Sequence, residues 1–141
     1  GPLLDRIDLH VPLAGLEFEE MSGPTGEPPP VVRGRVLEAR ERQRSRYART
    51  HALSNARLTP RVLRGLVRLD PRGERLLRRA VERNGLTARG FDRLLRVART
   101  IADLAGREQV TAADVAEALQ FRAWAIASFE VDDSKFLEQE H

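Results

Sequence analysis

Apolar residues recur at helical spacing through most of this chain, and the pattern is clearest between Thr87 and Gly106. There an apolar residue returns every three or four positions until the glycine ends the pattern. The positions concerned are Phe91, Leu94, Leu95, Ala98, Ile101, Ala102 and Ala105. A stripe of this width buries one face of a helix. We therefore expect this segment to be the central helix of the core.

Start and stop signals predict further helices around it. The first is expected over 31–50, with Val32, Val36, Ala39 and Tyr47 on its apolar side. The second begins at Thr59-Pro60, a capping hydroxyl followed by a proline at the first helical position, and carries Val62, Leu63, Leu66 and Val67. The third covers 71–84, buries Leu76, Leu77, Ala80 and Val81, and stops before Gly85. The fourth is the central helix described above. The fifth starts at Thr111, where Asp114 completes a capping box. The chain is thus predicted to be mainly all-α, a bundle of about five helices.

The first residues follow a different pattern. Residues 7–11 alternate apolar and polar side chains, which predicts a short strand. No other segment offers a strand to pair with it, and a lone strand is not stable in water. We expect the rest of its sheet to lie upstream in a longer parent protein.

Composition divides the chain into four parts. Residues 1–12 carry the strand, and residues 13–30 form an acidic connector rich in proline and glycine, which we expect to be flexible. The helical domain covers 31–122. Residues 123–141 extend the last helix into an acidic tail that we expect to fray, and we assign this tail no function.

Bulk composition excludes several classes of protein. The 141 residues are 41% hydrophobic and 32% charged, as in ordinary soluble domains, and none is a cysteine. Disulfides, cysteine-based metal sites and thiol catalysis are therefore excluded. The longest apolar run is far shorter than a membrane span needs. We expect a cytoplasmic protein with no membrane partner.

Charge is distributed unevenly along the chain. Residues 1–32 carry one arginine against six acids, residues 33–107 carry twenty-one arginines against seven acids, and residues 108–141 carry two basic against eight acidic side chains. A basic centre of this size attracts polyanions, whether nucleic acid, nucleotide phosphates or an acidic neighbouring subunit. The charge distribution alone does not show which of these three partners the chain binds.

No catalytic constellation is apparent. The three histidines are scattered over the chain with no serine or cysteine nucleophile placed near them. A phosphate-binding glycine loop is also absent, so the chain alone is expected to be inactive and to hold no metal.

Two arginines stand out by their position. Arg89 falls in the first turn of the central helix, where free backbone amides and the helix dipole favour an anion. An arginine at a helix start more often caps a neighbour or points into water. Arg6 precedes the predicted strand and could pair with Asp5 or Asp8, or project to another subunit.

Five stretches together resemble a known family. They are Gly1–Leu9, Val36–Gln43, Asn55–Leu58, Leu86–Leu104 and Val115–Arg122. In this order and spacing they resemble the C-terminal part of the magnesium-chelatase-like AAA+ ATPases, in the branch of the competence protein ComM. The Pro-rich stretch at 22–30 and the tail after Arg122 depart from the family pattern.

The resemblance implies a fold and residue roles. Residues 1–12 would end the ATPase core, and residues 31–122 would form the AAA+ lid. Arg6 matches the arginine finger, which reaches into the ATP site of the next subunit. Arg89 matches sensor 2, which contacts the phosphates of the ATP bound by its own subunit. ATP and Mg²⁺ would be the cofactors, held mostly by residues upstream.

The resemblance also implies partners. The ComM branch is an ATP-driven homo-hexameric motor that promotes branch migration of DNA. The candidates for lining the DNA path or meeting a neighbouring subunit are Arg40, Arg44, Arg75, Arg79, Arg93 and Arg96. Two alternatives stay open: a motor subunit of a magnesium chelatase, and a free-standing basic helical module that binds DNA.

Overall fold

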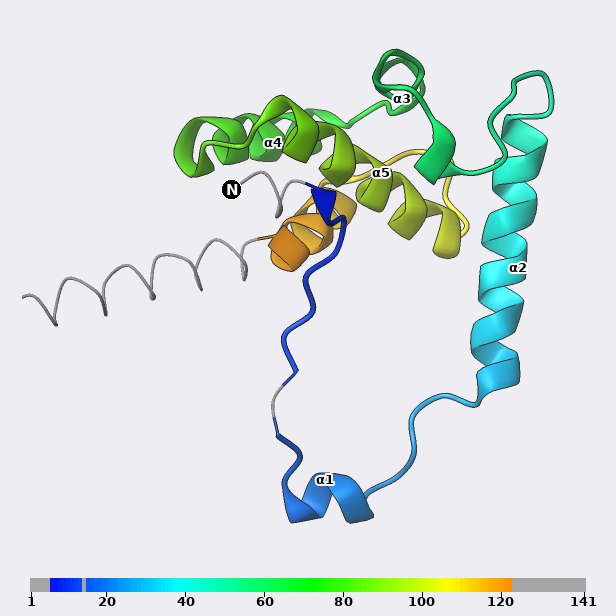
Figure 1. Cartoon of the computed structure of the whole chain (residues 1–141), viewed down its shortest axis with the longest axis vertical. Coiled ribbons are helices and arrows are strands. Elements are labelled where there is room, and N and C mark those ends of the chain that lie inside the picture. The colour runs from blue at the N-terminus through cyan, green and yellow to red at the C-terminus, as the bar shows by residue number, and fades with distance from the viewer. Residues whose placement is uncertain (1–5, 14, 123–141) are drawn as a thin grey trace, which may run out of the picture.

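The computed structural model describes residues 6–13 and 15–122 (Figure 1). In this part of the chain the elements are α1 (Phe18–Ser22), α2 (Pro29–Arg46), the 3-10 helix η2 (Asn55–Arg57), α3 (Pro60–Leu66), α4 (Pro71–Asn84), α5 (Ala88–Leu104) and a helix over 112–122. The β-structure in these ranges is one isolated parallel bridge between Leu69 and Val110. The mainly all-α prediction is confirmed. The predicted tail at 123–141 lies outside the described residues.

Local capping explains where the helices begin. Thr59 Oγ1 accepts a hydrogen bond from the Val62 amide at 3.4 Å, and an Asp70 carboxylate oxygen accepts one from the Gly73 amide at 2.7 Å. Each bond satisfies one of the amides that a helix start leaves without a partner. α4 ends at Asn84 and is capped by Gly85, whose φ of 59° is left-handed, as the Asn-Gly signal predicts.

The helix α5 forms the centre of the bundle, as predicted. Leu94, Leu95, Ala98 and Ala102 on one of its faces are all buried. They pack with residues from several other elements into one cluster, which also contains Tyr47, Leu58, Leu63, Val67, Leu77, Val110, Val115 and Ala118. Phe91 and Ile101 lie at the edge of this cluster, and Ala105 is exposed.

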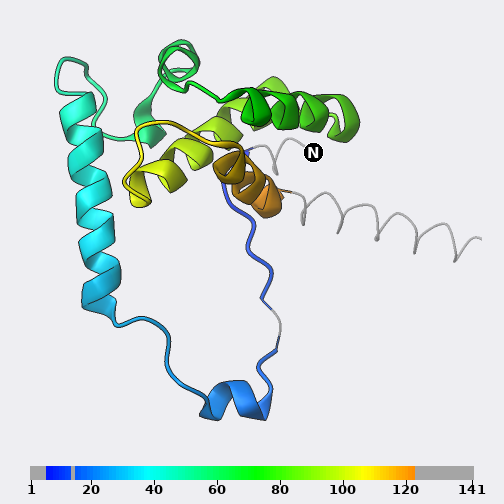
Figure 2. The ribbon, with the colours of Figure 1, turned by 180° about the vertical axis from the view of Figure 1, so that it is seen from behind.

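The helix α2 differs from its prediction in extent and in packing. It spans Pro29–Arg46 instead of 31–50. Its C-terminal part packs on the bundle through the buried Ala39 and Gln43, and Tyr47 directly after the helix is also buried, while its first turns project away from the other helices (Figures 1 and 2). Val32 and Val36, expected on the apolar side, are therefore 39% and 43% exposed.

The predicted strand at 7–11 is wrong for the described chain. Residues 7–13 have no regular secondary structure, because none of the described segments pairs with them as a strand to complete a ladder. The His10 amide instead donates to the carbonyl of Phe121 at 3.1 Å. The connector that follows contains α1, whose first turn is closed by a hydrogen bond from the Glu17 amide to Glu20 at 3.0 Å.

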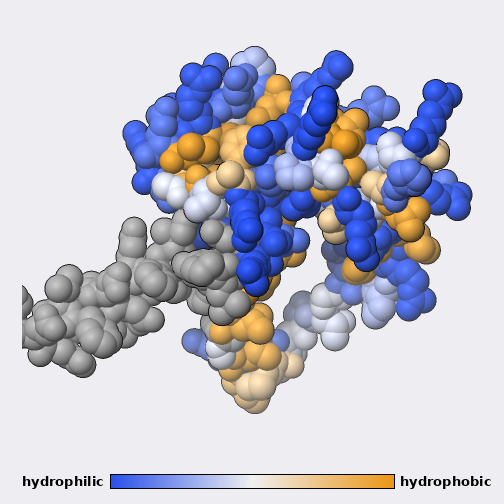
Figure 3. All heavy atoms as spheres, turned by 45° about the horizontal axis from the view of Figure 1, so that its top comes forward, coloured by the Kyte–Doolittle hydropathy of each residue, from blue (hydrophilic) through white to orange (hydrophobic). Residues whose placement is uncertain are grey.

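The surface is strongly hydrophilic over the bundle. Figure 3 shows charged and polar side chains covering much of the face turned to the viewer, with small apolar patches between them. Away from the bundle, apolar side chains around α1 are exposed, namely those of Leu13, Leu16, Phe18 and Met21. In the described ranges no helix combines the length and the apolar character that crossing a membrane requires.

Candidate functional site

The first candidate site is the N-terminus of α5. Thr87 caps the helix by accepting a hydrogen bond from the Gly90 amide at 3.0 Å. Arg89 is the second residue of the helix, and its side chain is exposed and forms no hydrogen bond or ion pair with the described residues. A guanidinium and the positive end of the helix dipole thus lie together, facing solvent. The prediction that Arg89 lies at a helix start is confirmed.

A second guanidinium lies against this helix start. A Cβ added to Gly90 would meet Nη2 of Arg122 at 3.2 Å and Cδ1 of Leu86 at 3.0 Å, so glycine is what allows the close approach. Arg122 is buried, and its Nη1 reaches the carbonyl of Ile7 at 3.4 Å. Ile7, which follows Arg6, and Gly90, which follows Arg89, therefore both lie beside the guanidinium of Arg122.

The segment that carries Arg6 is attached to α5 by a further contact. Asp8 accepts a hydrogen bond from Nη1 of Arg93 and forms an ion pair with it. Of the partners open to Arg6 in the sequence, Asp8 is engaged with Arg93 instead. Arg6 itself is exposed at the start of the described chain.

The six arginines proposed as a binding surface fall into two groups. Arg40, Arg44, Arg75 and Arg79 are exposed on α2 and α4, and Arg44 pairs with Glu41 at 3.2 Å. Arg93 and Arg96 are partly buried and engaged inside the fold. Arg93 pairs with Asp8, and Arg96 donates to the carbonyl of Leu58 at 2.9 Å. The first group is the one available to a partner.

A buried charge cluster was missed by sequence reasoning. Asp103 is buried at the centre of this cluster, and its carboxylate accepts hydrogen bonds from Arg46 at 2.5 Å and from Asn55 at 2.9 Å. It also forms an ion pair with Arg99 at 3.1 Å. Tyr47 donates to Asn55 at 2.6 Å and extends the network. The hydrogen bonds to Asp103 raise the pKa of Arg46, whereas burial lowers the pKa of Arg99. These groups join α2, η2 and α5.

One signal in the sequence pointed to this cluster. Arg99 and Asp103 stand four residues apart in the helix with the strongest apolar stripe, where opposite charges meet on one face. The pair looks like an ordinary surface pair until burial is known. Its partner Asn55 is far away in the chain, in a short stretch with no helical or strand period.

The arrangement at α5 is suited to binding an anion. Arginine offers a planar fork of donors that matches phosphate oxygens, and the first amides of a helix add further donors. The described residues contain no group of three or more acidic or histidine side chains that could hold a metal ion. This part of the chain thus offers contacts for phosphate and no metal-binding set of its own.

A family model matches residues 26–122 and is described as the C-terminal region of magnesium chelatase, subunit ChlI. The matched range covers α2 through the helix at 112–122. The chain belongs to the magnesium chelatase ChlI C-terminal family. The family assignment expected from the sequence is thereby confirmed, and the bundle with Arg89 at the start of α5 is the family's domain in this chain.

Curated relatives match more of the chain than the family model does. The chain is 38% identical over 125 residues to the competence protein ComM of Haemophilus influenzae, covering 87% of this chain and 24% of that protein. It is 42% identical over 122 residues to an uncharacterized protein of Mycobacterium tuberculosis, covering 86% of this chain and 24% of that protein. It is 36% identical over 125 residues to the uncharacterized protein YifB of Escherichia coli, with coverage of 87% and 24%. The chain spans about a quarter of the length of the relatives it matches.

Proposed function

We propose that this chain is the lid, with the adjoining end of the ATPase core, of a larger ATP-hydrolysing motor. Residues 1–12 would end the core, and residues 31–122 would form the lid. The family match, and relatives about four times as long, support this proposal. The observation that carries it is the arginine at the start of α5, exposed and joined through Arg122 to the segment that holds Arg6.

Arg89 acts on the nucleotide of its own subunit. Its fork binds phosphate oxygens and, with the first amides of α5, holds the lid against the nucleotide. When bound, ATP would supply the phosphoanhydride bond that is cleaved, and Mg²⁺ would supply positive charge. Loss of the terminal phosphate removes contacts to Arg89, so the lid is freed to move.

Arg6 acts on the nucleotide of the neighbouring subunit. It reaches across the interface and stabilises the charge that develops on the transferred phosphoryl group. Asp8 and Ile7, which follow it, are bound to Arg93 and Arg122. Movement of the lid in one subunit therefore changes the position of the arginine offered to the next.

The motor is proposed to be a homo-hexamer that acts on branched DNA in the bacterial cytoplasm. The similarity to a protein named for competence supports this choice. Exposed arginines on α2 and α4 supply positive charge that attracts the DNA backbone or acidic surfaces of the neighbouring subunit.

The family match also favours a second candidate, because the matching model is named for a magnesium chelatase subunit. In that case the same lid would drive insertion of Mg²⁺ into a porphyrin together with partner subunits. The nucleotide chemistry of Arg6 and Arg89 would be unchanged. The two candidates differ in whether DNA or the porphyrin-binding partner stimulates ATP hydrolysis.

The test measures ATP hydrolysis by the full-length protein, with and without branched DNA. Arg89→Ala should lower turnover roughly tenfold or more, because a contact to the reacting phosphates is lost. Arg83→Ala, which removes another exposed arginine at the end of α4, is the matched control and should stay near wild type. Arg6→Ala mixed into wild-type subunits should lower activity beyond simple dilution.

Three results would count against parts of the proposal. Wild-type turnover in Arg89→Ala would show that the start of α5 has no role in ATP hydrolysis. Loss in proportion to dilution would place the trans-acting arginine elsewhere. ATP hydrolysis that is stimulated by a porphyrin-binding partner and not by DNA would favour the chelatase.

A further inference from the structure

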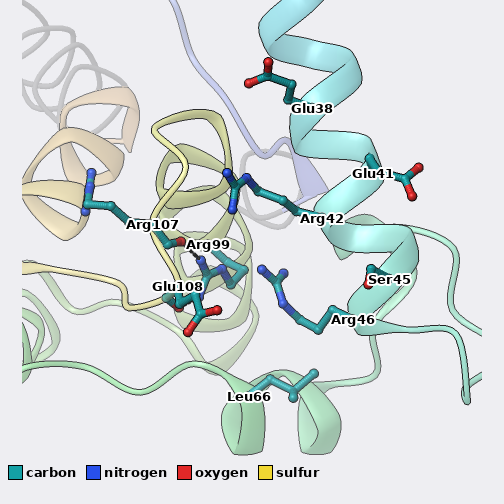
Figure 4. A pocket seen from close by; sticks show the side chains of 9 residues that line it. All are labelled: Glu38, Glu41, Arg42, Ser45, Arg46, Leu66, Arg99, Arg107 and Glu108. Carbon is teal, nitrogen blue, oxygen red and sulfur yellow. Dashed lines mark hydrogen bonds between the residues drawn. The ribbon is translucent and has the colours of Figure 1, made fainter.

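A cleft of about 780 Å³ lies between the C-terminal part of α2 and the end of α5, far along α5 from Arg89. Figure 4 shows the side chains that line it. They are Glu38, Glu41, Arg42, Ser45, Arg46, Leu66, Arg99, Arg107 and Glu108. Four of the nine are arginines, contributed by α2, by α5 and by the loop that follows α5.

Three of these four guanidiniums pair with two carboxylates, those of Asp103 and Asp114. Arg46 and Arg99 share the single carboxylate of Asp103. Their mutual repulsion contributes to the lowered pKa of Arg99, after the larger effect of burial. Arg107 has a carboxylate of its own in Asp114, at 2.6 Å. In addition, the buried Nε of Arg99 has no hydrogen-bond partner among the described residues.

Arg42 adds a cation that no described carboxylate pairs. Its side chain extends from α2 across the cleft toward Arg99 and Arg107 (Figure 4). Its Nη2 lies 3.2 Å from where a Cβ on Gly106 would stand, so the guanidinium rests over the turn that ends α5. It forms no hydrogen bond or ion pair within the described part of the chain.

The acidic residues that line the cleft form no ion pair with Arg42 in the described chain. Glu41 pairs with Arg44, and its side chain points away from the four arginines (Figure 4). Glu38 projects from the same side of α2 as Arg42 but forms no ion pair within the described part of the chain (Figure 4). Glu108 contributes its backbone carbonyl to Arg99, while its side chain is exposed. Among the described residues, Arg42 is therefore the cleft arginine that has no ion-pair partner, whereas Arg46, Arg99 and Arg107 each have one.

We propose that this cleft binds a phosphate-bearing anion, with Arg42 as the principal contact and Arg46 and Arg107 beside it. Forked guanidiniums donate in pairs to phosphate oxygens and stay charged at every physiological pH. A nucleic-acid backbone and a free polyphosphate share this chemistry. The site does not depend on the ATPase proposal, because the chain alone contains all of its residues.

The experiment measures binding by the chain at low ionic strength. A fluorescent single-stranded oligonucleotide and inorganic tripolyphosphate are titrated separately, and then in competition. Arg42→Gln should weaken binding about fivefold or more, because one charge-assisted contact is lost. Thermal unfolding should be unchanged, since Arg42 holds no described partner. Arg57→Gln and Arg61→Gln, which change exposed arginines of η2 and α3 outside the cleft, are the matched controls and should change binding less than about twofold.

Each outcome is decisive. If both probes bind and compete, with loss in Arg42→Gln, the cleft is a general phosphate site. If only one probe binds with that loss, the source of the phosphate is identified as nucleic acid or polyphosphate. Equal losses in all three variants would indicate a diffuse basic surface and overturn the proposal, as would the absence of binding by the wild type. Neither result alters the outcome expected for Arg89→Ala in ATP hydrolysis.

Discussion

Asp8 and Arg93 are 85 residues apart in the chain and form an ion pair that attaches the first described segment to the central helix. Two neighbouring contacts support the same attachment. Arg122 donates to the carbonyl of Ile7, and the His10 amide donates to the carbonyl of Phe121. A segment without secondary structure of its own is thereby positioned by side chains of the bundle.

Removing this ion pair should loosen the segment without unfolding the bundle. In Asp8→Asn, we expect the His10 amide to exchange its hydrogen faster, while the core amides of α5 keep their protection. Global stability should fall by less than about 1 kcal/mol, because both side chains are partly exposed. Hydrogen exchange measured by NMR tests this. Glu27→Gln, which removes the exposed pair of Glu27 with Arg35, is the control, and unchanged exchange at His10 would show that the pair does not hold the segment.

Asp103→Asn should be among the most destabilising single changes in the chain. It leaves Arg46 and the buried Arg99 without their shared counter-charge. Breaking a buried pair from one side typically costs about 3–5 kcal/mol. Urea denaturation of the chain measures the loss.

A matched variant separates burial from charge. Glu41→Gln removes the exposed pair of Glu41 with Arg44 and changes the net charge by the same amount. Its expected cost is about 0–1 kcal/mol. Similar losses for Asp103→Asn and Glu41→Gln would mean that the buried cluster contributes little to stability.

Most of the helical fold could be predicted because its signals are local. Thr59-Pro60, Asp70-Pro71 and Asn84-Gly85 mark helix ends through bonds within a few residues, and the structure contains these ends. The extent of α2 was harder to predict. Its arginine-rich sequence has no strong apolar stripe, and its first turns have no described neighbour that would bury Val32 and Val36.

The candidate site also has one part that could be predicted from the sequence and one part that could not. The position of Arg89 at a helix start follows from local capping at Thr87. The contacts along the first turns of α5 do not, because Arg122 lies against Gly90 and Asp8 pairs with Arg93, and these two residues come from opposite ends of the described chain. The strand predicted at 7–11 failed for a related reason, since alternation cannot supply the neighbouring strand that a ladder requires.

Two glycines should respond to alanine in opposite directions. Gly85 has a φ of 59°, where a Cβ is strained, so Gly85→Ala should cost about 1 kcal/mol. Gly65 lies within α3 with open space around it, so Gly65→Ala should stabilise by roughly 0.5–1 kcal/mol. Thermal unfolding of both variants measures the difference. A stabilising Gly85→Ala would mean that the left-handed turn after α4 is not maintained in solution, and a destabilising Gly65→Ala would mean that the space around Gly65 is not open.

Acid should destabilise the chain partly through Asp114, which is buried at the start of the last described helix. Burial by itself raises the pKa of Asp114, but the hydrogen bonds from Arg107 and from Thr111 together outweigh it and hold the pKa below its ordinary value. The amide of Thr111 donates to this carboxylate at 2.9 Å, which is the backward half of the predicted capping box. The Thr111 hydroxyl donates to the same carboxylate at 3.1 Å.

The sign of the pH dependence follows from the lowered pKa. As pH falls, the unfolded chain takes up the Asp114 proton before the folded chain does, so this contribution is complete above an unfolded pKa of about 4 and is lost below it. Asp114→Asn should cost about 1–3 kcal/mol at neutral pH and make the loss of stability below about pH 4 shallower. Urea midpoints measured across this range test both effects. Glu82→Gln controls for the change in net charge, and a slope equally altered in that variant would assign the acid sensitivity to overall charge instead of Asp114.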